Sequence, residues 1–150
     1  MIKRNKSSTD SVRTPKEILQ YVEKRWGKFY DPVPYKEHFD PVKDKDALKT
    51  KWGKVNFVNP PYSRPKWFLQ KGIKLWKLDK TVSVFLVKND IIGSKYFSRL
   101  GREAELIFFD RRVTFENYDR PASFSSMLVV FDGKNPGQYN FVNLRELYKQ

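Results

Sequence analysis

Short hydrophobic runs along the chain predict a set of strands. Four of these runs are rich in β-branched and aromatic residues, and each has the length of a buried strand rather than of a helix. They lie at residues 55–58, 81–87, 104–109 and 126–131. The segment KFYDPVP, residues 28–34, predicts a further short strand whose carboxyl end carries Asp31. Pro32 and Pro34 stop this strand, because proline lacks the N–H that a strand ladder needs.

The first predicted helix has a defined start and a defined end. Its apolar face is formed by Ile18, Val22 and Trp26. Thr14 is a natural N-cap, Pro15 suits the first helical position, and Glu17 completes a capping box. Gly27 ends the helix. The capping box explains these residues without any ligand, and contact with a ligand at the same helix start is the alternative.

Helical spacing returns after the strand at residues 55–58. The segment KWFLQKGIKLWK predicts a helix in which Trp67, Phe68, Leu69 and Trp76 face the core, and stacking on bases is the alternative for these residues. Shorter helices are predicted in SKYFSRL and NLRELYKQ. Because strands alternate with helices, the pattern predicts an α/β fold in which helices cover the faces of a sheet.

The length of 150 residues suits one domain with one hydrophobic core. Residues 1–11 are polar and lack periodicity, so we expect a flexible basic arm there and a single folded domain over residues 12–150. No run of about 18 apolar residues occurs and no signal peptide opens the sequence. A soluble, cytoplasmic protein is therefore expected.

Charge favours a polyanionic partner. Lys and Arg together number 30 against 17 acidic residues, which gives a formal net charge of +13. Nucleic acid is the expected partner, and an anionic membrane surface is the alternative. The absence of Cys and the single His, His38, exclude disulfides, thiolate nucleophiles and the usual zinc sites, so no metal is expected.

The sequence NPPY directly follows the predicted strand at residues 55–58. In an open α/β sheet, ligands bind beyond the carboxyl ends of the strands. The side-chain oxygen of Asn59 and the carbonyl oxygen of Pro60 are two acceptors, and they suit both hydrogens of a base's exocyclic amine. The ring of Tyr62 suits stacking on a base that has been flipped out of a duplex. The two prolines make this corner rigid.

These motifs together resemble the phage-type DNA adenine N6-methyltransferase (Dam-like) family. NPPY resembles the catalytic motif of amino-methylating DNA methyltransferases, and the other segments of the family follow in the same order over most of the chain, roughly residues 14–131. The matching segments are Thr14-Pro15, Asp31-Pro32, Asp46-Ala47-Leu48, Trp52, NPPY, FLVKNDIIGSKYF, FFDRRVTF and PASFSSMLVVF.

The resemblance implies a minimal Rossmann-like methyltransferase fold with a mixed, mostly parallel sheet. It implies S-adenosylmethionine as the donor of a methyl group that passes directly to the N6 amine of a flipped adenine. The catalytic residues that it implies are Asn59, Pro60, Pro61 and Tyr62. The cofactor-binding residues that it implies are Thr14, Pro15, Asp31, Pro32, Asp46, Ala47 and Leu48. Asp40 and Asp44 are both available for the ribose hydroxyls.

Basic residues beside the corner and beside a later strand end are candidates for contact with DNA phosphates. They are Arg64, Lys66, Arg111 and Arg112. A homodimer is a further expectation, because few residues remain for a separate recognition domain. Two alternatives for function stay open: transfer to the N4 amine of cytosine, and a nucleic-acid-binding protein that keeps the fold without binding the cofactor.

Overall fold

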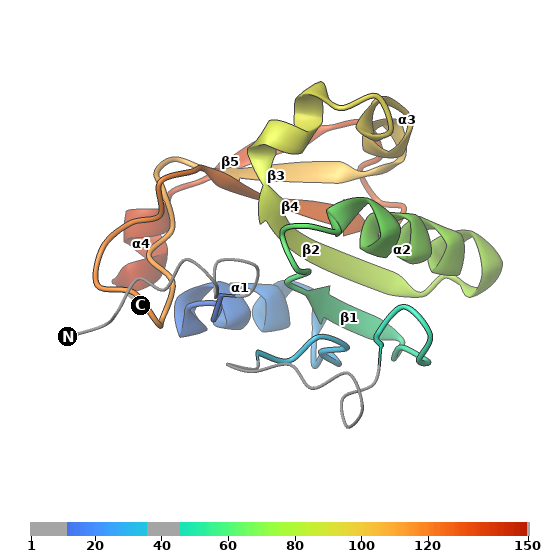
Figure 1. Cartoon of the computed structure of the whole chain (residues 1–150), viewed down its shortest axis with the longest axis horizontal. Coiled ribbons are helices and arrows are strands. Elements are labelled where there is room, and N and C mark those ends of the chain that lie inside the picture. The colour runs from blue at the N-terminus through green and yellow to red at the C-terminus, as the bar shows by residue number, and fades with distance from the viewer. Residues whose placement is uncertain (1–11, 36–45, 150) are drawn as a thin grey trace.

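The computed structural model describes residues 12–35 and 46–149, and these residues form an α/β structure around one sheet (Figure 1). The sheet has five strands in the order β1-β2-β4-β3-β5. The strands are β1 (Val55–Val58), β2 (Val82–Lys88), β3 (Glu105–Phe109), β4 (Ser126–Phe131) and β5 (Tyr139–Val142). The predicted runs at residues 55–58 and 126–131 coincide with β1 and β4. The run at residues 81–87 is shifted by one residue at both ends relative to β2, and the run at residues 104–109 starts one residue before β3.

The sheet is mixed and mostly parallel, as predicted. β1 pairs with β2 in parallel, and β3 pairs with β5 in parallel. β4 is antiparallel to both of its neighbours, β2 and β3. Four strands therefore run in one direction, and their carboxyl ends lie along one edge of the sheet.

The short strand predicted to end at Asp31 is reduced to a single bridge. Only Tyr30 pairs with the sheet, through a parallel bridge to Asn56 of β1. The strand pairing stops there because Pro32 and Pro34 lack an N–H, and because the N–H of Val33 donates to the side chain of Asp31 instead of to a strand. The bridge still places Asp31 at the carboxyl edge, beside the end of β1.

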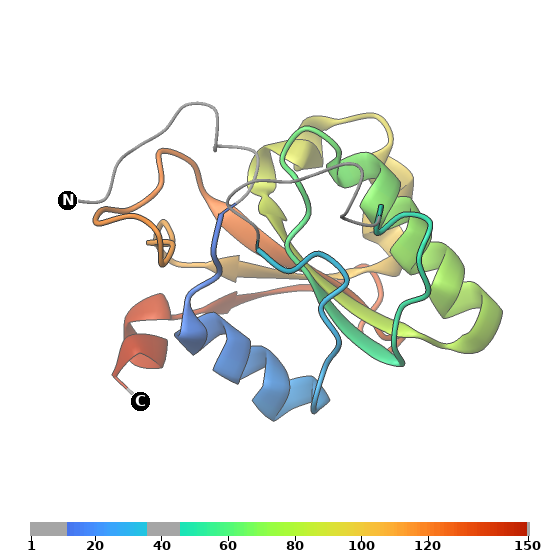
Figure 2. The same ribbon diagram turned by 60° about the horizontal axis from the view of Figure 1, so that its bottom comes forward.

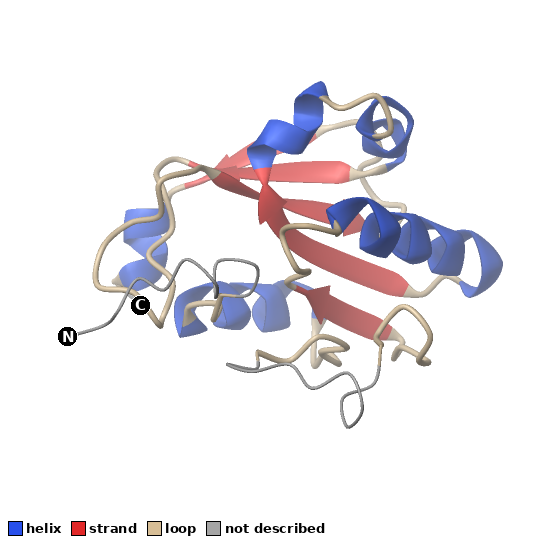
Figure 3. Ribbon diagram, viewed as in Figure 1, coloured by secondary structure: helices blue, strands red, loops and turns tan. Residues whose placement is uncertain are grey.

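Helices cover both faces of the sheet (Figure 3). They are α1 (Lys16–Trp26), α2 (Pro65–Asp79), α3 (Phe97–Leu100) and α4 (Leu144–Tyr148), with short 3₁₀ helices η2 (Asn89–Gly93) and η3 (Gly101–Glu103). On one face, Phe68 and Leu69 of α2 pack in a core cluster with Phe97 of α3. On the other face, Ile18 of α1 packs in a second cluster with Leu144 of α4. The predicted α/β class with helices on both faces is confirmed.

Two glycines are required by the geometry of these helices. Gly27 ends α1 at a φ of 88°, a conformation that residues with a side chain rarely adopt. Gly72 lies in α2 where the helix crosses the sheet, and a Cβ atom there would be 2.5 Å from the ring of Phe85 in β2. The missing side chain therefore lets α2 pack closely on the strand that follows it.

β5 was not among the strands that the sequence predicted. Its side chains are mostly exposed, and Tyr139 and Phe141 lie on the outer edge of the sheet beside Phe108 of β3. A strand with no buried face lacks the alternation that signals a strand in sequence. Its pairing with β3 is decided by tertiary structure.

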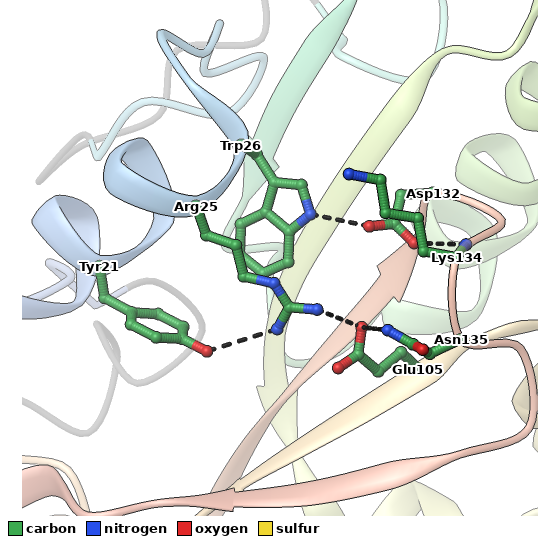
Figure 4. A network of polar contacts seen from close by, with 7 residues as sticks. All are labelled: Tyr21, Arg25, Trp26, Glu105, Asp132, Lys134 and Asn135. Carbon is green, nitrogen blue, oxygen red and sulfur yellow. Dashed lines mark hydrogen bonds and ion pairs between the residues drawn. The ribbon is translucent and has the colours of Figure 1, made fainter.

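A buried polar network fixes the end of α1 to the amino edge of the sheet (Figure 4). Glu105, at the start of β3, accepts hydrogen bonds from Arg25 Nη2 at 2.5 Å and from Asn135 Nδ2 at 3.3 Å. Trp26 Nε1 donates to Asp132 at 2.9 Å. Because Arg25 and Trp26 form the last turn of α1, these contacts also determine where the start of the helix lies at the opposite edge.

Arg25→Met is expected to lower the free energy of unfolding by about 2–3 kcal/mol, because it leaves the carboxylate of Glu105, only 6% exposed, without its cationic partner. Lys77→Met is the matched control. Lys77 pairs with Glu103, but both of these side chains are about half exposed, so the change should be within about 0.5 kcal/mol. Urea unfolding followed by circular dichroism measures both. Equal losses in the two variants would contradict a stabilising role for the buried pair.

The predicted arm at residues 1–11 lies outside the described residues, as do His38, Asp40 and Asp44. Within residues 12–35 and 46–149, no helix is long and apolar enough to span a lipid bilayer. The same residues contain no group of three or more metal-ligating side chains that could hold a metal ion.

Candidate active site at the carboxyl edge of the sheet

The carboxyl edge of the sheet gathers most of the residues that the sequence singled out. β1 leads directly into Asn59, and the Tyr30 bridge leads into Asp31 on the neighbouring segment. The loop between β3 and β4 lies at the same edge, where β3 and β5 end (Figure 2). Segments that are far apart in the sequence therefore meet around the corner that follows β1.

Asn59 is held in one orientation by the segment that precedes α1. Its Nδ2 group donates to the carbonyl oxygen of Val12 and to Thr14 Oγ1, both at 3.0 Å. A carbonyl oxygen only accepts hydrogen bonds, so the nitrogen of the amide must face Val12. Oδ1 is consequently on the other side of the amide, and no donor among the described residues reaches it.

The predicted capping box at the start of α1 is wrong. The helix begins at Lys16, and Pro15 occupies the cap position without a side-chain cap. The N–H of Lys16 donates instead to Glu116 Oε1, at 3.1 Å. Thr14 Oγ1 instead accepts the hydrogen bond from Asn59, and Pro15 is buried. Thr14 therefore contacts the corner directly instead of capping the helix.

The corner itself is a tight turn between two prolines and a helix. Pro60 is buried, and the carbonyl oxygen of Pro61 accepts the N–H of Arg64 at 3.0 Å. α2 begins at the next residue. No hydrogen bond from the described part of the chain reaches the carbonyl oxygen of Pro60. Asn59 and Pro60 thus each offer one acceptor at a rigid position.

Tyr62 packs into the core cluster on the α1 face. Its ring contacts Phe124 edge to face, with a centroid distance of 5.1 Å and an interplanar angle of 79°. The hydroxyl is buried without a hydrogen-bond partner in the described structure. Burial raises the pKa of Tyr62 above its ordinary value, and the nearby Tyr118 adds a smaller rise. The hydroxyl therefore stays neutral.

Lys88, the last residue of β2, extends over the same rings. Its Nζ lies 4.5 Å from the ring centroid of Tyr62 and 4.4 Å from that of Phe124. Both distances are within the range of a cation–π interaction. The sequence did not single out Lys88 or Phe124, because they come close to Tyr62 only when β2 and the loop before β4 meet β1.

Asp31 is a half-buried carboxyl group at this edge, followed by the buried Pro32. Its Oδ1 accepts the N–H of Val33 at 2.9 Å. Burial raises the pKa of Asp31 to about 6, and the hydrogen bond from Val33 opposes this shift. Ionisation near neutral pH leaves a carboxylate whose second oxygen has no donor among the residues that the structure describes. A cationic or hydroxyl-bearing ligand would satisfy it.

The segment Asp46-Ala47-Leu48 forms a turn held by α2. Asp46 Oδ1 accepts the N–H of Leu48 at 2.9 Å. Lys71 of α2 donates to the carbonyl oxygens of Ala47 and Leu48, each at 3.1 Å, and to that of Thr50 at 2.5 Å. Burial lowers the pKa of Lys71, and Asp46 opposes this. This turn packs with the α2-face core, whereas Asn59 contacts the segment before α1.

The start of α2 presents cations and an aromatic ring beside the corner. Arg64 is exposed, and Lys66 Nζ lies 5.1 Å from the ring centroid of Trp67 and 5.8 Å from that of Tyr96. The prediction that Trp67 faces the core is wrong, because the residue is 53% exposed. Trp67 lies on the side of α2 that turns away from the sheet, while the adjacent Phe68 packs inward.

Arg111 and Arg112 follow β3 and are exposed at the same edge. Arg111 Nε lies 3.8 Å from Asp110 Oδ1, an oxygen that also accepts the N–H of Leu144. β2 and β4 lie between β1 and β3, so three interstrand spacings place this pair roughly 14 Å along the sheet from the corner. The basic candidates therefore form two groups on one edge rather than a single cluster.

Comparison with known proteins gives a consistent picture. A family model described as DNA N-6-adenine-methyltransferase (Dam) matches residues 2–149. A DNA N-6-adenine-methyltransferase of Escherichia phage T1 is 30% identical over 163 residues, which cover 94% of this chain and 66% of that protein. One of Haemophilus phage HP1 (strain HP1c1) is 30% identical over 160 residues, which cover 95% of this chain and 91% of that protein. No solved structure matches the chain.

Proposed function

The chain belongs to the DNA N-6-adenine-methyltransferase (Dam) family, and from this membership we propose that it transfers a methyl group from S-adenosylmethionine to the N6 amine of adenine in DNA. The observation that supports this proposal most is the orientation of Asn59. Its amide nitrogen is engaged by Val12 and Thr14, which leaves Oδ1 available as an acceptor beside the Pro60 carbonyl.

Asn59 and Pro60 act on the amine. The amino group of adenine is a poor nucleophile because its lone pair is conjugated with the ring. Asn59 Oδ1 and the carbonyl oxygen of Pro60 accept its two hydrogens and draw the nitrogen towards a tetrahedral geometry, in which the lone pair is free. Because Pro60 and Pro61 fix the backbone, the acceptors need little reorganisation during the reaction.

Tyr62 holds the base outside the duplex. Flipping a nucleotide costs a few kcal/mol of lost pairing and stacking, and an aromatic ring returns part of this through a new stack. The edge-to-face contact with Phe124 limits rotation of the Tyr62 ring. The base therefore meets a platform that is already in position.

The residues at the carboxyl edge fit S-adenosylmethionine, which when bound supplies a methyl group on a cationic sulfonium. Asp31 offers a carboxylate with one oxygen that no described donor reaches, in a setting where burial opposes its charge. A cationic group nearby offsets that cost. Thr14, Pro15 and Pro32 are the further residues proposed for the cofactor, together with Asp46, Ala47 and Leu48 from the turn held by Lys71.

DNA contacts are proposed along the same edge. Arg64 and Lys66 lie beside the corner, and Arg111 and Arg112 lie across the sheet, so the two groups suit phosphates on either side of the flipped nucleotide. The exposed ring of Trp67 suits stacking on a base next to the vacated position.

The decisive experiment is incubation of the protein with isotopically labelled S-adenosylmethionine and DNA of mixed sequence, followed by nucleoside analysis. Label in N6-methyladenine is the expected result. Label in N4-methylcytosine would show that the methyl group is transferred to cytosine and not to adenine. Binding of DNA without any label in nucleosides, together with no heat of S-adenosylmethionine binding, would overturn the enzyme and support a nucleic-acid-binding protein of the same fold.

Tyr62→Phe is expected to retain most of the transfer activity and to raise the free energy of unfolding by about 1 kcal/mol, because it removes a buried hydroxyl that has no partner. Tyr62→Leu keeps an apolar side chain but loses the flat ring. It should weaken capture of the base by about 1–3 kcal/mol, seen as a higher KM for DNA. Equal KM values for the two variants would exclude stacking on Tyr62.

A further inference from the structure

We propose that Lys88 is a substrate-binding residue. In the DNA-free protein, its ammonium group occupies the ring face of Tyr62 that receives the target base. When the base enters, the ammonium group moves to a phosphate of the extruded nucleotide. This inference rests on the proposed function, because it takes Tyr62 as the stacking ring.

The position of Lys88 follows from the sheet. It ends β2 and pairs with Ser126 at the start of β4, so it lies at the carboxyl edge between the corner and the loop before β4. Its Nζ lies above both rings, 4.5 Å from the centroid of Tyr62 and 4.4 Å from that of Phe124. The ammonium therefore occupies a ring face of the proposed base platform.

The charge of Lys88 has no anionic partner in the described parts of the chain. No carboxylate there forms an ion pair with it, and its Nζ donates no hydrogen bond to a described residue. Lys71 provides the contrast, because its Nζ donates to three carbonyl oxygens and so serves the structure of a turn. Within the described residues the three donors of Lys88 have no acceptor, and we expect a ligand to supply one.

The ammonium and a stacked base exclude each other. Stacked rings lie in contact at about 3.5–4.0 Å, which leaves no room for a cation 4.5 Å above the same ring. The amine also becomes positive as it is methylated, and a nearby ammonium would oppose that charge. The anion that enters with the base is its phosphate, and the flexible four-carbon stem of lysine allows the ammonium to follow it.

The test compares 2′-deoxyadenosine with its 3′- and 5′-monophosphates, titrated into the full-length protein and followed through the NMR shifts of the ligand ring protons. The wild-type protein should bind one monophosphate about tenfold more tightly than the nucleoside. Lys88→Met should remove this preference and bind the nucleoside at least as tightly as the wild type does, because the ring face is vacated. Lys88→Arg should keep the preference.

Lys54→Met is the matched control, because Lys54 is exposed at the opposite edge of the sheet and its loss changes the net charge equally. This variant should behave as the wild type. Thermal melting checks that each variant folds, and Lys88→Gln replaces Lys88→Met if the latter does not.

A preference for the monophosphate that survives in a folded Lys88→Met protein would overturn the inference. So would an equal weakening of nucleoside and nucleotide binding, which would indicate a structural role. A wild-type protein that methylates adenine in DNA but shows no preference would overturn the role of Lys88 alone. A wild-type protein that shows the preference but transfers no methyl group would overturn the proposed function instead.

Discussion

Asn59→Ala is expected to lower the rate of methyl transfer by roughly 100-fold to 1000-fold. The reason is that the hydrogen bond from the amine to Asn59 Oδ1 strengthens as the nitrogen becomes cationic, so its loss falls mainly on the transition state. Single-turnover transfer from labelled S-adenosylmethionine to DNA measures this rate. The KM for DNA should change far less than the rate.

Asn59 also has a structural contact, and the experiment must separate the two roles. Thr14→Val removes one of the two acceptors of Asn59 Nδ2 but leaves Oδ1 in place. At saturating S-adenosylmethionine this variant should lose about fivefold in rate, the equivalent of one neutral hydrogen bond of about 1 kcal/mol. Thermal melting of both variants reports on folding. Full transfer by a well-folded Asn59→Ala protein would overturn the mechanism.

Asp31→Asn is expected to weaken S-adenosylmethionine binding at pH 7 by about 1.5–3 kcal/mol, the contribution of a hydrogen bond to a charged group. The wild-type affinity should rise as the pH increases from 5 to 7 and the carboxyl group ionises, because the pKa of Asp31 is about 6. The variant should lack this rise. Calorimetric titration at several pH values measures both effects, and equal affinities at pH 7 would move the contact to Asp40 or Asp46.

The same carboxyl group should make the free protein less stable at neutral pH. The pKa of Asp31 is higher in the folded protein than the ordinary value of 3.8, so the folded state retains the proton longer than the unfolded state does. The free energy of unfolding contributed by this group therefore falls as the pH rises from about 4 to 6, by up to about 2–3 kcal/mol.

Urea unfolding across that pH range provides the check. Asp31→Asn should remove this fall and should be the more stable protein at pH 7. A variant that is both more stable and weaker in cofactor binding would mark Asp31 as a functional residue whose charge destabilises the free protein. A loss of stability at pH 7 would instead indicate that Asp31 serves the fold through its contact with Val33.

Several features of the site could be predicted from sequence because their signals are local. Two prolines after a short apolar run predict a rigid corner wherever they occur, and Asn59 and Tyr62 lie within that corner. The turn at Asp46 also depends on contacts within a few residues, apart from the hydrogen bonds that Lys71 of α2 donates to it. The existence of the corner and the residues within it could therefore be predicted from adjacent positions.

Other features depend on pairs of residues that are distant in sequence. The sequence predicted a capping role for Thr14, yet Thr14 contacts Asn59, 45 residues away. Trp67 has helical spacing with core residues, but whether it faces the sheet depends on how α2 packs, and α2 packs through Phe68 and Gly72. Local periodicity cannot distinguish a residue at the margin of an apolar face from one at its centre.

The sequence by itself determined the α/β class, the bounds of β1 and β4, the corner from Asn59 to Tyr62, and the excess of positive charge. The first three depend on hydrophobic periodicity and on proline within a few neighbouring residues, and the charge depends only on composition. Tertiary structure alone decided that β4 runs antiparallel between β2 and β3. It also decided that Lys88 and Phe124 meet Tyr62. Strand order is set by burial of the two sheet faces between helices, a free energy that depends on the whole chain at once.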